Sequence, residues 1–404
     1  MRNFLFNKYF DKLLFALSIM ILAGLLIRMG SNRVSSAPNS TNLTFSQWWE
    51  NDSDREIFLD LIKEFEGLND GIMVTLNTIP YEDLRVELLN AGEAAFPGDI
   101  IALDLLWVPE LPALEICEAP LFSFVNVLYY NVELLKDAGF SRPPKTRSEF
   151  LACARTLKSR SGNRQGAGFA LSFELGDNSS RGIYDDVFPW IWAAGAELVQ
   201  DGKPALTSRP VVESLSFLAA LKSEGLIDDG LFYADAGKKL EDFLSGKTAF
   251  IIAPSGYIGF VRERMGEETF GVTSVPIPDN YARGTFFGSA EWTIGINPAS
   301  AAKEEARLFA DFLADKTFTI SEKIGALPEN GVSPAWDPLH SKVSEIAIAG
   351  ESASDLSGLP WTELEKSFRE ELKMLFEGKA SPAETAAAIQ RKWEAVISSA
   401  DYSR

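Results

Sequence analysis

Strand and helix signals alternate along most of this chain, and this alternation restricts its fold more than any other feature of the sequence. Apolar, strand-like runs at 43–46, 72–76 and 99–103 are separated by stretches in which apolar residues recur with helical spacing. The run at 99–103 is apolar throughout after its first residue, as expected of a parallel strand that is covered on both faces. Similar runs follow at 168–173 and 249–252. The pattern predicts an α/β protein.

Polar residues mark several predicted helix starts, because the first backbone N–H groups of a helix have no partner within the helix. Three pairs have the spacing of a capping box: Ser53 with Glu56, Thr146 with Glu149, and Thr362 with Glu365. A further start combines Ser381, Pro382 and Glu384 in the favoured first positions. A short helix over 131–137 is expected to end at Gly139.

Length and charge narrow the class of protein. A chain of 404 residues is long enough for two lobes, and 46% hydrophobic with 24% charged residues is typical of a soluble globular protein. The formal net charge of −19 argues against binding to nucleic acid, whose phosphates need a basic surface. It also argues against broad contact with anionic lipid.

The amino terminus has the features of an export signal. Arg2, Lys8 and Lys12 precede an uninterrupted apolar stretch at 13–27, which is short for a bilayer span and typical of a signal peptide. We interpret residues 1–42 as a signal peptide or signal anchor followed by a linker. This predicts a periplasmic or extracellular protein, with tethering to the inner membrane by an uncleaved segment as the open alternative. No cysteine lies near the end of the apolar stretch, so we expect no lipoprotein anchor.

Residues for covalent catalysis are scarce. His340 is the only histidine and lies in a predicted loop flanked by prolines, and no Gly-x-Ser-x-Gly motif accompanies it. The run 245–248 (Ser-Gly-Lys-Thr) resembles the end of a phosphate-binding loop, but Glu241 stands where the leading glycine is required. The sequence therefore predicts no catalytic residue, and a glycosidase with two carboxylates remains the enzymatic alternative.

Metal and disulfide sites are not expected either. The acidic pairs at 185–186 and 228–229 do not have the spacing of a calcium loop and are typical of a solvated surface. Cys153 shares an apolar helix face with Phe150 and Leu157, which predicts a buried thiol, and a disulfide with Cys117 is the alternative. We expect no cofactor and no bound metal.

Aromatic residues stand where two predicted strands end. Trp48 and Trp49 follow the run at 43–46, and Trp107 follows the run at 99–103. Ligands of open α/β sheets bind at the carboxyl ends of strands. Glu50 and Asp104 place a carboxylate near each aromatic group, and a sugar needs both a stacking surface and hydroxyl acceptors. These positions predict a carbohydrate site, with core packing of the rings as the competing interpretation.

An ordered set of short motifs resembles family 1 of the extracellular solute-binding proteins, the maltose-binding-protein-like receptors of ABC importers. The most specific are 128–131 (Leu-Tyr-Tyr-Asn), 134–139 (Leu-Leu-Lys-Asp-Ala-Gly) and 143–146 (Pro-Pro-Lys-Thr). Weaker matches follow the family's order at 81–84, 97–100, 243–249, 275–278, 288–295 and 306–313. The resemblance covers about residues 43–400.

This resemblance implies a type II periplasmic-binding-protein fold. Two α/β lobes, each a mostly parallel sheet flanked by helices, would be joined by crossing hinge strands near 121–128 and 285–294. The implied first lobe comprises 43–124 and 287–330, and the second comprises 125–286 and 331–404. The implied function is capture of a mono- or oligosaccharide by hinge closure in a monomeric protein, and delivery to the permease of an ABC importer.

The family positions also imply which residues contact the solute. They are Trp48, Glu50, Tyr81, Asp104, Trp107, Asp185, Trp190, Tyr257, Glu291, Trp292 and Trp361. Core packing is the alternative for each of them, and Trp192 and Trp393 are assigned to the core. A short segment at 109–120 replaces a longer one in the family, which would open the cleft, admit a larger solute or abolish sugar binding. A receptor for a non-sugar solute such as a polyamine, and a membrane-anchored sensor, remain the alternative functions.

Overall fold

The computed structural model describes most of the chain from residue 40 onward. The described residues are 40–49, 52–91, 95–116, 122–161, 168–281, 289–328, 338–349, 356 and 358–399, without the side chains of 52, 53, 161, 289–291 and 328. The predicted export segment at 13–27 and Cys117 lie outside these residues.

One group of elements, which we call the first lobe, is built on three parallel strands. They are β1 (Thr41–Gln47), β2 (Ile72–Thr78) and β3 (Ile100–Asp104), in the order β2-β1-β3. Strand β11 (Ser289–Ile296) pairs antiparallel with β3, and Trp292 lies opposite Asp104. The helices of this lobe are α2 (Asp52–Leu68), α3 (Tyr81–Asn90), α10 (Lys303–Asp315) and α11 (Thr317–Ile324). Its short elements are η1 (Val108–Glu110) and β4 (Glu115–Ile116).

The core of the first lobe forms where α2 and α10 cover the sheet. Phe45 of β1 is fully buried, and its ring lies 5.8 Å from that of Phe58 and 5.6 Å from that of Phe309. The alternation of β1 therefore places its apolar side chains against both helices.

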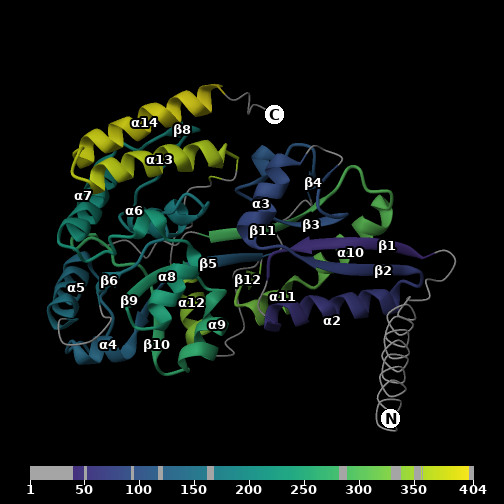
Figure 1. Cartoon of the computed structure of the whole chain (residues 1–404), viewed down its shortest axis with the longest axis horizontal. Helices are drawn as coiled ribbons and strands as arrows, with labels where there is room; N and C mark the ends of the chain where they lie inside the picture. Colours follow the sequence, from purple (N-terminus) through teal and green to yellow (C-terminus); the bar gives the residue numbers. More distant parts are fainter. Residues whose placement is uncertain are drawn as a thin grey trace, which may run out of the picture.

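Strand β5 (Phe122–Asn131) connects this lobe to the rest of the molecule. Its first half pairs with β11 and with β12 (Leu327–Pro328), whereas its second half pairs with β9 (Thr248–Pro254) and β10 (Phe270–Thr273). Figure 1 shows β5 and β11 in the middle of the molecule, between two groups of helices. The crossing strands implied by the family resemblance are these two strands.

The second group of elements, the second lobe, surrounds the far half of β5. Strand β6 (Phe169–Leu171) pairs parallel with β9 and completes the order β5-β9-β6. Its helices before β9 are α4 (Val132–Asp137), α5 (Arg147–Ser161), α6 (Phe188–Trp192), α7 (Arg209–Ser223) and α8 (Ala236–Leu244). Those after it are α9 (Tyr257–Met265), α12 (Pro338–Ala349), α13 (Trp361–Phe376) and α14 (Pro382–Ser399). Its short elements are the π-helical turn η2 (Ile183–Val187), η3 (Leu231–Tyr233) and the ribbon β7 (Val199–Gln200) with β8 (Lys203–Pro204).

The last two helices pack in the second lobe, although more than a hundred residues separate them from α7. α13 and α14 pack against each other and against α7, as their position beside α7 in Figure 1 indicates. Trp192 and Trp393 are both fully buried in this region, which confirms their assignment to the core.

Local signals at helix starts were only partly correct. At α14, Ser381 and Glu384 form a full capping box, because the Ser381 N–H donates to the Glu384 carboxylate at 2.9 Å and the Glu384 N–H donates to the Ser381 hydroxyl at 3.3 Å. The prediction that Thr362 caps α13 is wrong, because the helix begins at Trp361 and the Thr362 hydroxyl bonds to Glu110. The predicted loop at His340 is wrong as well: this buried residue lies in the first turn of α12.

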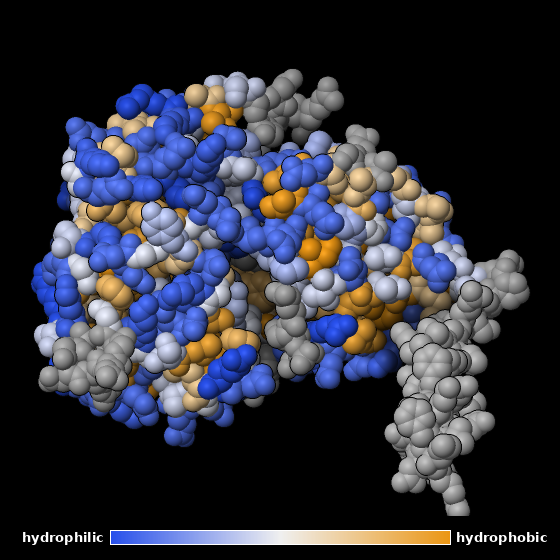
Figure 2. Space-filling view, in the orientation of Figure 1, coloured by the Kyte–Doolittle hydropathy of each residue, from blue (hydrophilic) through white to orange (hydrophobic). Residues whose placement is uncertain are grey.

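Hydrophilic residues cover most of the face in Figure 2. Within the described part of the chain, none of the helices is both long enough and apolar enough to cross a membrane. Cys153 is a buried free thiol as predicted, and burial raises its pKa to about 12.

Candidate functional site

Four aromatic rings gather at the carboxyl ends of β1 and β3. The Trp48 ring lies 4.7 Å from Trp49, 5.3 Å from Tyr81 and 5.6 Å from Trp107. The buried Gln47 side chain holds the turn after β1, because its amide donates to the Thr78 hydroxyl at 2.7 Å and its carbonyl accepts from the Trp49 N–H. The sequence prediction that these strand ends carry an aromatic group is thus confirmed in its geometry. Trp48 and Tyr81 are partly exposed, whereas Trp49 and Trp107 are buried.

Asp104 ends β3 directly beside these rings. Its carboxylate accepts a hydrogen bond from the Tyr81 hydroxyl at 2.9 Å and one from the Leu106 N–H at 2.9 Å. It also accepts from Arg181, which comes from the second lobe. Burial, followed by the charge of Asp104, raises the pKa of Tyr81 well above its usual value, so this phenol stays a hydrogen-bond donor.

Arg181 links both lobes in the interior. Besides Asp104, its guanidinium contacts Asp185 at 3.0 Å through two nitrogens, and it lies 4.8 Å from the Tyr184 ring. Arg181 and Asp185 are four residues apart at η2, which places them on one side of that turn. Asn126 of β5 donates to Asp185 at 2.8 Å and extends the network to the crossing strand. Burial alone would lower the pKa of Arg181, but Asp104 and Asp185 raise it well above its usual value.

A second group of buried charges lies next to the first. Lys239 of α8 donates to Glu174 at 2.9 Å, to Asp186 at 2.9 Å and to the carbonyl of Ile252 at 3.0 Å. Asp186 also accepts from the Glu174 N–H at 2.6 Å. Because Asp185 and Asp186 are adjacent in η2, this turn directs one carboxylate toward Arg181 and the next toward Lys239. The prediction of a solvated acidic pair at 185–186 is therefore wrong, since both side chains are buried.

Burial dominates the protonation of these groups. It raises the pKa of Glu174 to about 8 and that of Asp186 to about 6, although Lys239 acts in the opposite direction on both. Tyr257, at the first turn of α9, faces the same charges: burial raises its pKa to about 12, and Glu174 contributes. The predicted contact residue Tyr257 is thus placed at the second lobe's side of the site.

Three other predicted contacts lie in cores instead. Trp190 is fully buried against Phe150 and Phe217. Trp292 is 1% exposed, with its ring stacked 4.6 Å from Phe122. Trp361 is equally buried, and its indole N–H donates to the Ser180 carbonyl at 2.8 Å. All three rings fill the interior of the lobes. Trp292 also contacts the aromatic group from within, because its ring lies 5.0 Å from that of Trp49 and 6.5 Å from that of Trp48. Glu50 and the side chain of Glu291 lie outside the described residues.

The two lobes touch along one rim beside Arg181. Glu82 of α3 accepts from the Ser180 N–H at 2.8 Å and from the Ser180 hydroxyl at 3.0 Å. Glu110 accepts from the Thr362 N–H at 2.7 Å, and Arg85 donates to the Thr362 hydroxyl. These contacts join the two lobes on the side of Ser180 and Thr362.

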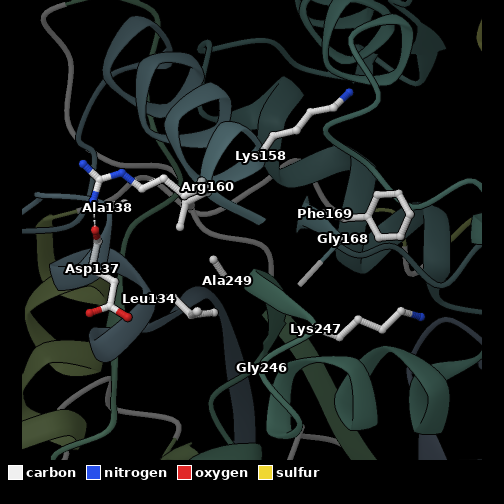
Figure 3. A pocket seen from close by; sticks show the side chains of 11 residues that line it. Leu134, Asp137, Ala138, Lys158, Arg160, Gly168, Phe169, Gly246, Lys247 and Ala249 are labelled. Carbon is white, nitrogen blue, oxygen red and sulfur yellow. Dashed lines mark hydrogen bonds between the residues drawn. The ribbon is translucent and has the colours of Figure 1, made fainter. Parts of the chain in front are cut away.

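A separate pocket of about 60 Å³ lies on the second lobe, between α4, α5, β6 and the turn before β9. Figure 3 shows Arg160, whose guanidinium bonds to the Asp137 carbonyl, and Lys247 among its lining residues. None of the site residues described above lines this pocket.

Comparison with known proteins agrees with this architecture. Residues 51–317 match the family of bacterial extracellular solute-binding proteins. The chain belongs to this family.

Individual relatives of this solute-binding protein are distant. A binding protein of Brucella abortus is 22% identical over 380 residues, covering 84% of this chain and 89% of that protein. An ABC transporter-binding protein of Deinococcus radiodurans is 29% identical over 184 residues, covering 37% and 43% of the two chains.

Solved structures share the two-lobed fold. The cyclic alpha-maltosyl-1,6-maltose binding protein of Arthrobacter globiformis has a TM-score of 0.71 at 17% identity, covering 89% of this chain and all of its own. An ABC substrate-binding protein of Listeria monocytogenes, in complex with cycloalternan, has a TM-score of 0.72 at 14% identity with the same coverage. At such identities the likeness shows the fold of this solute-binding protein.

Several site residues were not found from the sequence of this solute-binding protein. No sequence motif marks these residues, and each bonds to a partner that is distant in the chain. They are Arg181, Asn126, Glu174 and Lys239. The only local signal is the spacing of four between Arg181 and Asp185, which is common on helix surfaces.

Proposed function

We propose that this solute-binding protein captures a carbohydrate between its lobes by hinge closure and delivers it to the permease of an ABC importer. The observation that carries the proposal is the aromatic group around Trp48 at the carboxyl end of β1, beside the polar groups of the second lobe. Sugar rings stack on aromatic faces through their C–H groups, and their hydroxyls need directed acceptors and donors. Trp48 and Tyr81 supply partly exposed rings, and Tyr257 supplies a hydroxyl from the opposite lobe.

The known relatives support the same solute class. One solved relative is named for a maltosyl-maltose, and others were determined with maltose, maltotriose or tagatose. We infer that the chain passes between the lobes at 124/125, at 286/287 and at about 330/331. We also infer that the protein is a monomer and acts on the extracytoplasmic side of the membrane. A solute that touches both lobes favours the closed state, whereas one that contacts a single lobe equally in both states shifts nothing.

A thermal-shift screen of the full exported chain tests the proposal. A sugar that binds only the native state must raise the melting temperature, and chromatography should recover that sugar unchanged. A response to polyamines with silence across mono- and oligosaccharides would contradict a carbohydrate solute. A hydrolysed sugar would instead indicate a glycosidase.

The substitution Trp48→Ala tests whether the solute binds at the aromatic group around Trp48. We expect it to weaken binding of the sugar found in the screen by about 1–3 kcal/mol, because the stacking surface is lost. Tyr233→Ala is the matched control, since Tyr233 is an aromatic residue of the second lobe that is 89% exposed and absent from the site. Equal affinities of the two variants for the sugar would argue against this placement.

A further inference from the structure

The buried charges between the lobes do not balance. Four carboxylates, those of Asp104, Glu174, Asp185 and Asp186, face only the two cations Arg181 and Lys239. All six side chains are at least nine-tenths buried, and among the described residues no further cation forms an ion pair with these carboxylates. The fully ionised cluster therefore carries a net charge of −2, which is unfavourable in an interior of low dielectric constant.

Two acceptor atoms of this cluster also lack a donor. Glu174 Oε2 and Asn126 Oδ1 are buried, and no described residue donates a hydrogen bond to either. The other oxygen of Glu174 is bound to Lys239, and the Asn126 amide is bound to Asp185, so each side chain is held at its other end. A buried acceptor without a partner is destabilising, so both atoms favour a donor that comes from outside the chain.

The position of these atoms connects them to the proposed solute site. Asn126 lies on the crossing strand β5, and Glu174 follows the carboxyl end of β6, the edge at which α/β sheets bind ligands. Tyr257 lies close enough to Glu174 for the carboxylate to affect its pKa. Arg181 ties the same cluster to Asp104, next to the aromatic group of the first lobe.

We propose that the captured carbohydrate carries a cationic amino group, which binds at Glu174 and Asn126. This inference rests on the proposed function and specifies its solute class as a basic saccharide. An ammonium group supplies up to three hydrogen-bond donors, and its charge offsets part of the negative excess. A neutral hydroxyl supplies one donor and leaves the excess charge in place.

Matched pairs of sugars test the inference on the wild-type protein. Each pair differs only at carbon 2: glucosamine with glucose, galactosamine with galactose, mannosamine with mannose, and the β-1,4-linked tetramers of glucosamine and glucose. Titration calorimetry near pH 6, where the amines are protonated, should give at least about tenfold tighter binding to the amine of any pair that binds. Burial favours a proton on Glu174 in the free protein at this pH, so an ammonium that binds the carboxylate should displace that proton. Repeating the titration in buffers of different ionisation enthalpy measures whether a proton is released or taken up.

The outcomes separate this inference from the proposed function. Equal affinities within the pairs would overturn the basic saccharide and leave carbohydrate capture intact. The same conclusion would follow if neutral sugars bound with proton uptake and their amines bound no more tightly. Binding of neutral sugars with no response to any amine would do the same. Binding of spermidine without any saccharide would overturn both.

A variant locates the amino group. Glu174→Gln should reduce the ratio of amine to hydroxyl affinity toward one, because it removes the unpartnered carboxylate. Glu241→Gln, on an exposed position of α8, removes the same charge at the surface and should leave the ratio unchanged. A wild-type ratio in Glu174→Gln would overturn this assignment, and circular dichroism establishes that each variant is folded. If Glu174→Gln does not fold, the wild-type pairs still decide the solute class.

Discussion

At the scale of single residues, Glu174 combines deep burial with an incomplete set of partners. It is 4% exposed, bonds to Lys239 through one oxygen, and lies next to Asp186. Burial therefore favours its protonated form, and its pKa is raised to about 8 from an ordinary value of 4.5. The free protein should respond to pH at this residue.

We expect Glu174→Gln to change how stability depends on pH. Between about pH 4.5 and pH 8 the folded state retains a proton on Glu174 that the unfolded state releases. The contribution of this group is therefore fully present below the unfolded pKa and is lost as pH rises through the folded pKa. Urea unfolding across this window should show the stability difference moving in favour of Glu174→Gln as pH rises. Parallel curves for the two proteins would contradict the raised pKa.

Trp292 and Trp48 should respond differently to truncation. Trp292 is 1% exposed and stacks on Phe122, so Trp292→Ala should lower the free energy of unfolding by about 3–5 kcal/mol through loss of packing and formation of a cavity. Trp48 is partly exposed, so Trp48→Ala should lower it by less. Chemical denaturation of both variants measures the free energy of unfolding. A larger decrease for Trp48→Ala than for Trp292→Ala would contradict the assignment of Trp292 to the core.

The sequence predicted site residues well only where position along a strand decides them. Trp48, Asp104 and Trp107 follow strand ends, so their gathering at one edge of the sheet follows from the fold class. The sequence did not distinguish the partly exposed Trp48 from the buried Trp292, because Phe122 covers Trp292 through a contact between distant segments. Arg181 was missed for the same reason, because Asp104 and Arg181 lie far apart in the sequence and meet only in the folded molecule.

At the scale of elements, the π-helical turn η2 organises the charged cluster. All five of its residues are buried, and its consecutive carboxylates Asp185 and Asp186 bond to different cations. π-Helical turns are rare and occur frequently at functional sites. Gly182 precedes this turn with its backbone against the Glu174 carbonyl, where a Cβ atom would overlap the carbonyl oxygen.

We expect opposite effects of alanine at two helical glycines. Gly182→Ala should lower the melting temperature, because the backbone of η2 or of residue 174 must shift to accommodate the new methyl group. Gly259→Ala, at an exposed position of α9 with no atom near the new Cβ, should raise stability by up to about 1 kcal/mol through helix propensity. Thermal unfolding measures both, and a neutral Gly182→Ala would show that η2 tolerates rearrangement.

The existence of most elements followed from local sequence, whereas their exact starts did not. The strands at β1, β2, β3 and β9 appear where apolar runs predicted them. The signal at Thr362 failed because its hydroxyl is used between lobes by Glu110 and Arg85, a contact invisible to local spacing. His340 was assigned to a loop because its flanking prolines hid the helix that begins at Pro338.

At the scale of the whole molecule, a few polar contacts hold the lobes together. The buried bond from Arg181 to Asp104 and the bonds from Ser180 to Glu82 all join α3 or β3 to the segment just before η2. Without Arg181, the carboxylates of Asp104 and Asp185 would face each other across the lobes. Like charges in a buried site repel strongly.

Arg181→Ala should therefore open the molecule. Small-angle scattering of the solute-free variant should give a larger radius of gyration than wild type, because opening exposes both carboxylates to water. Arg209→Ala is the control: Arg209 also pairs with an acid four residues on, but that pair is exposed on α7 and contributes little. An unchanged radius of gyration in Arg181→Ala would show that the other rim contacts suffice for closure.

The place of β11 in the sheet determines the order in which the protein can assemble. This strand lies between β3 and β5, yet it is synthesised only after nearly all of the second lobe's sheet. A nascent chain that has just completed β5 cannot form the native neighbour of β3, since the pairing of Trp292 with Asp104 joins segments far apart in sequence. Such long-range pairing slows folding. The sheet of the first lobe therefore remains incomplete until late in synthesis, which prolongs the period in which this lobe is unfolded.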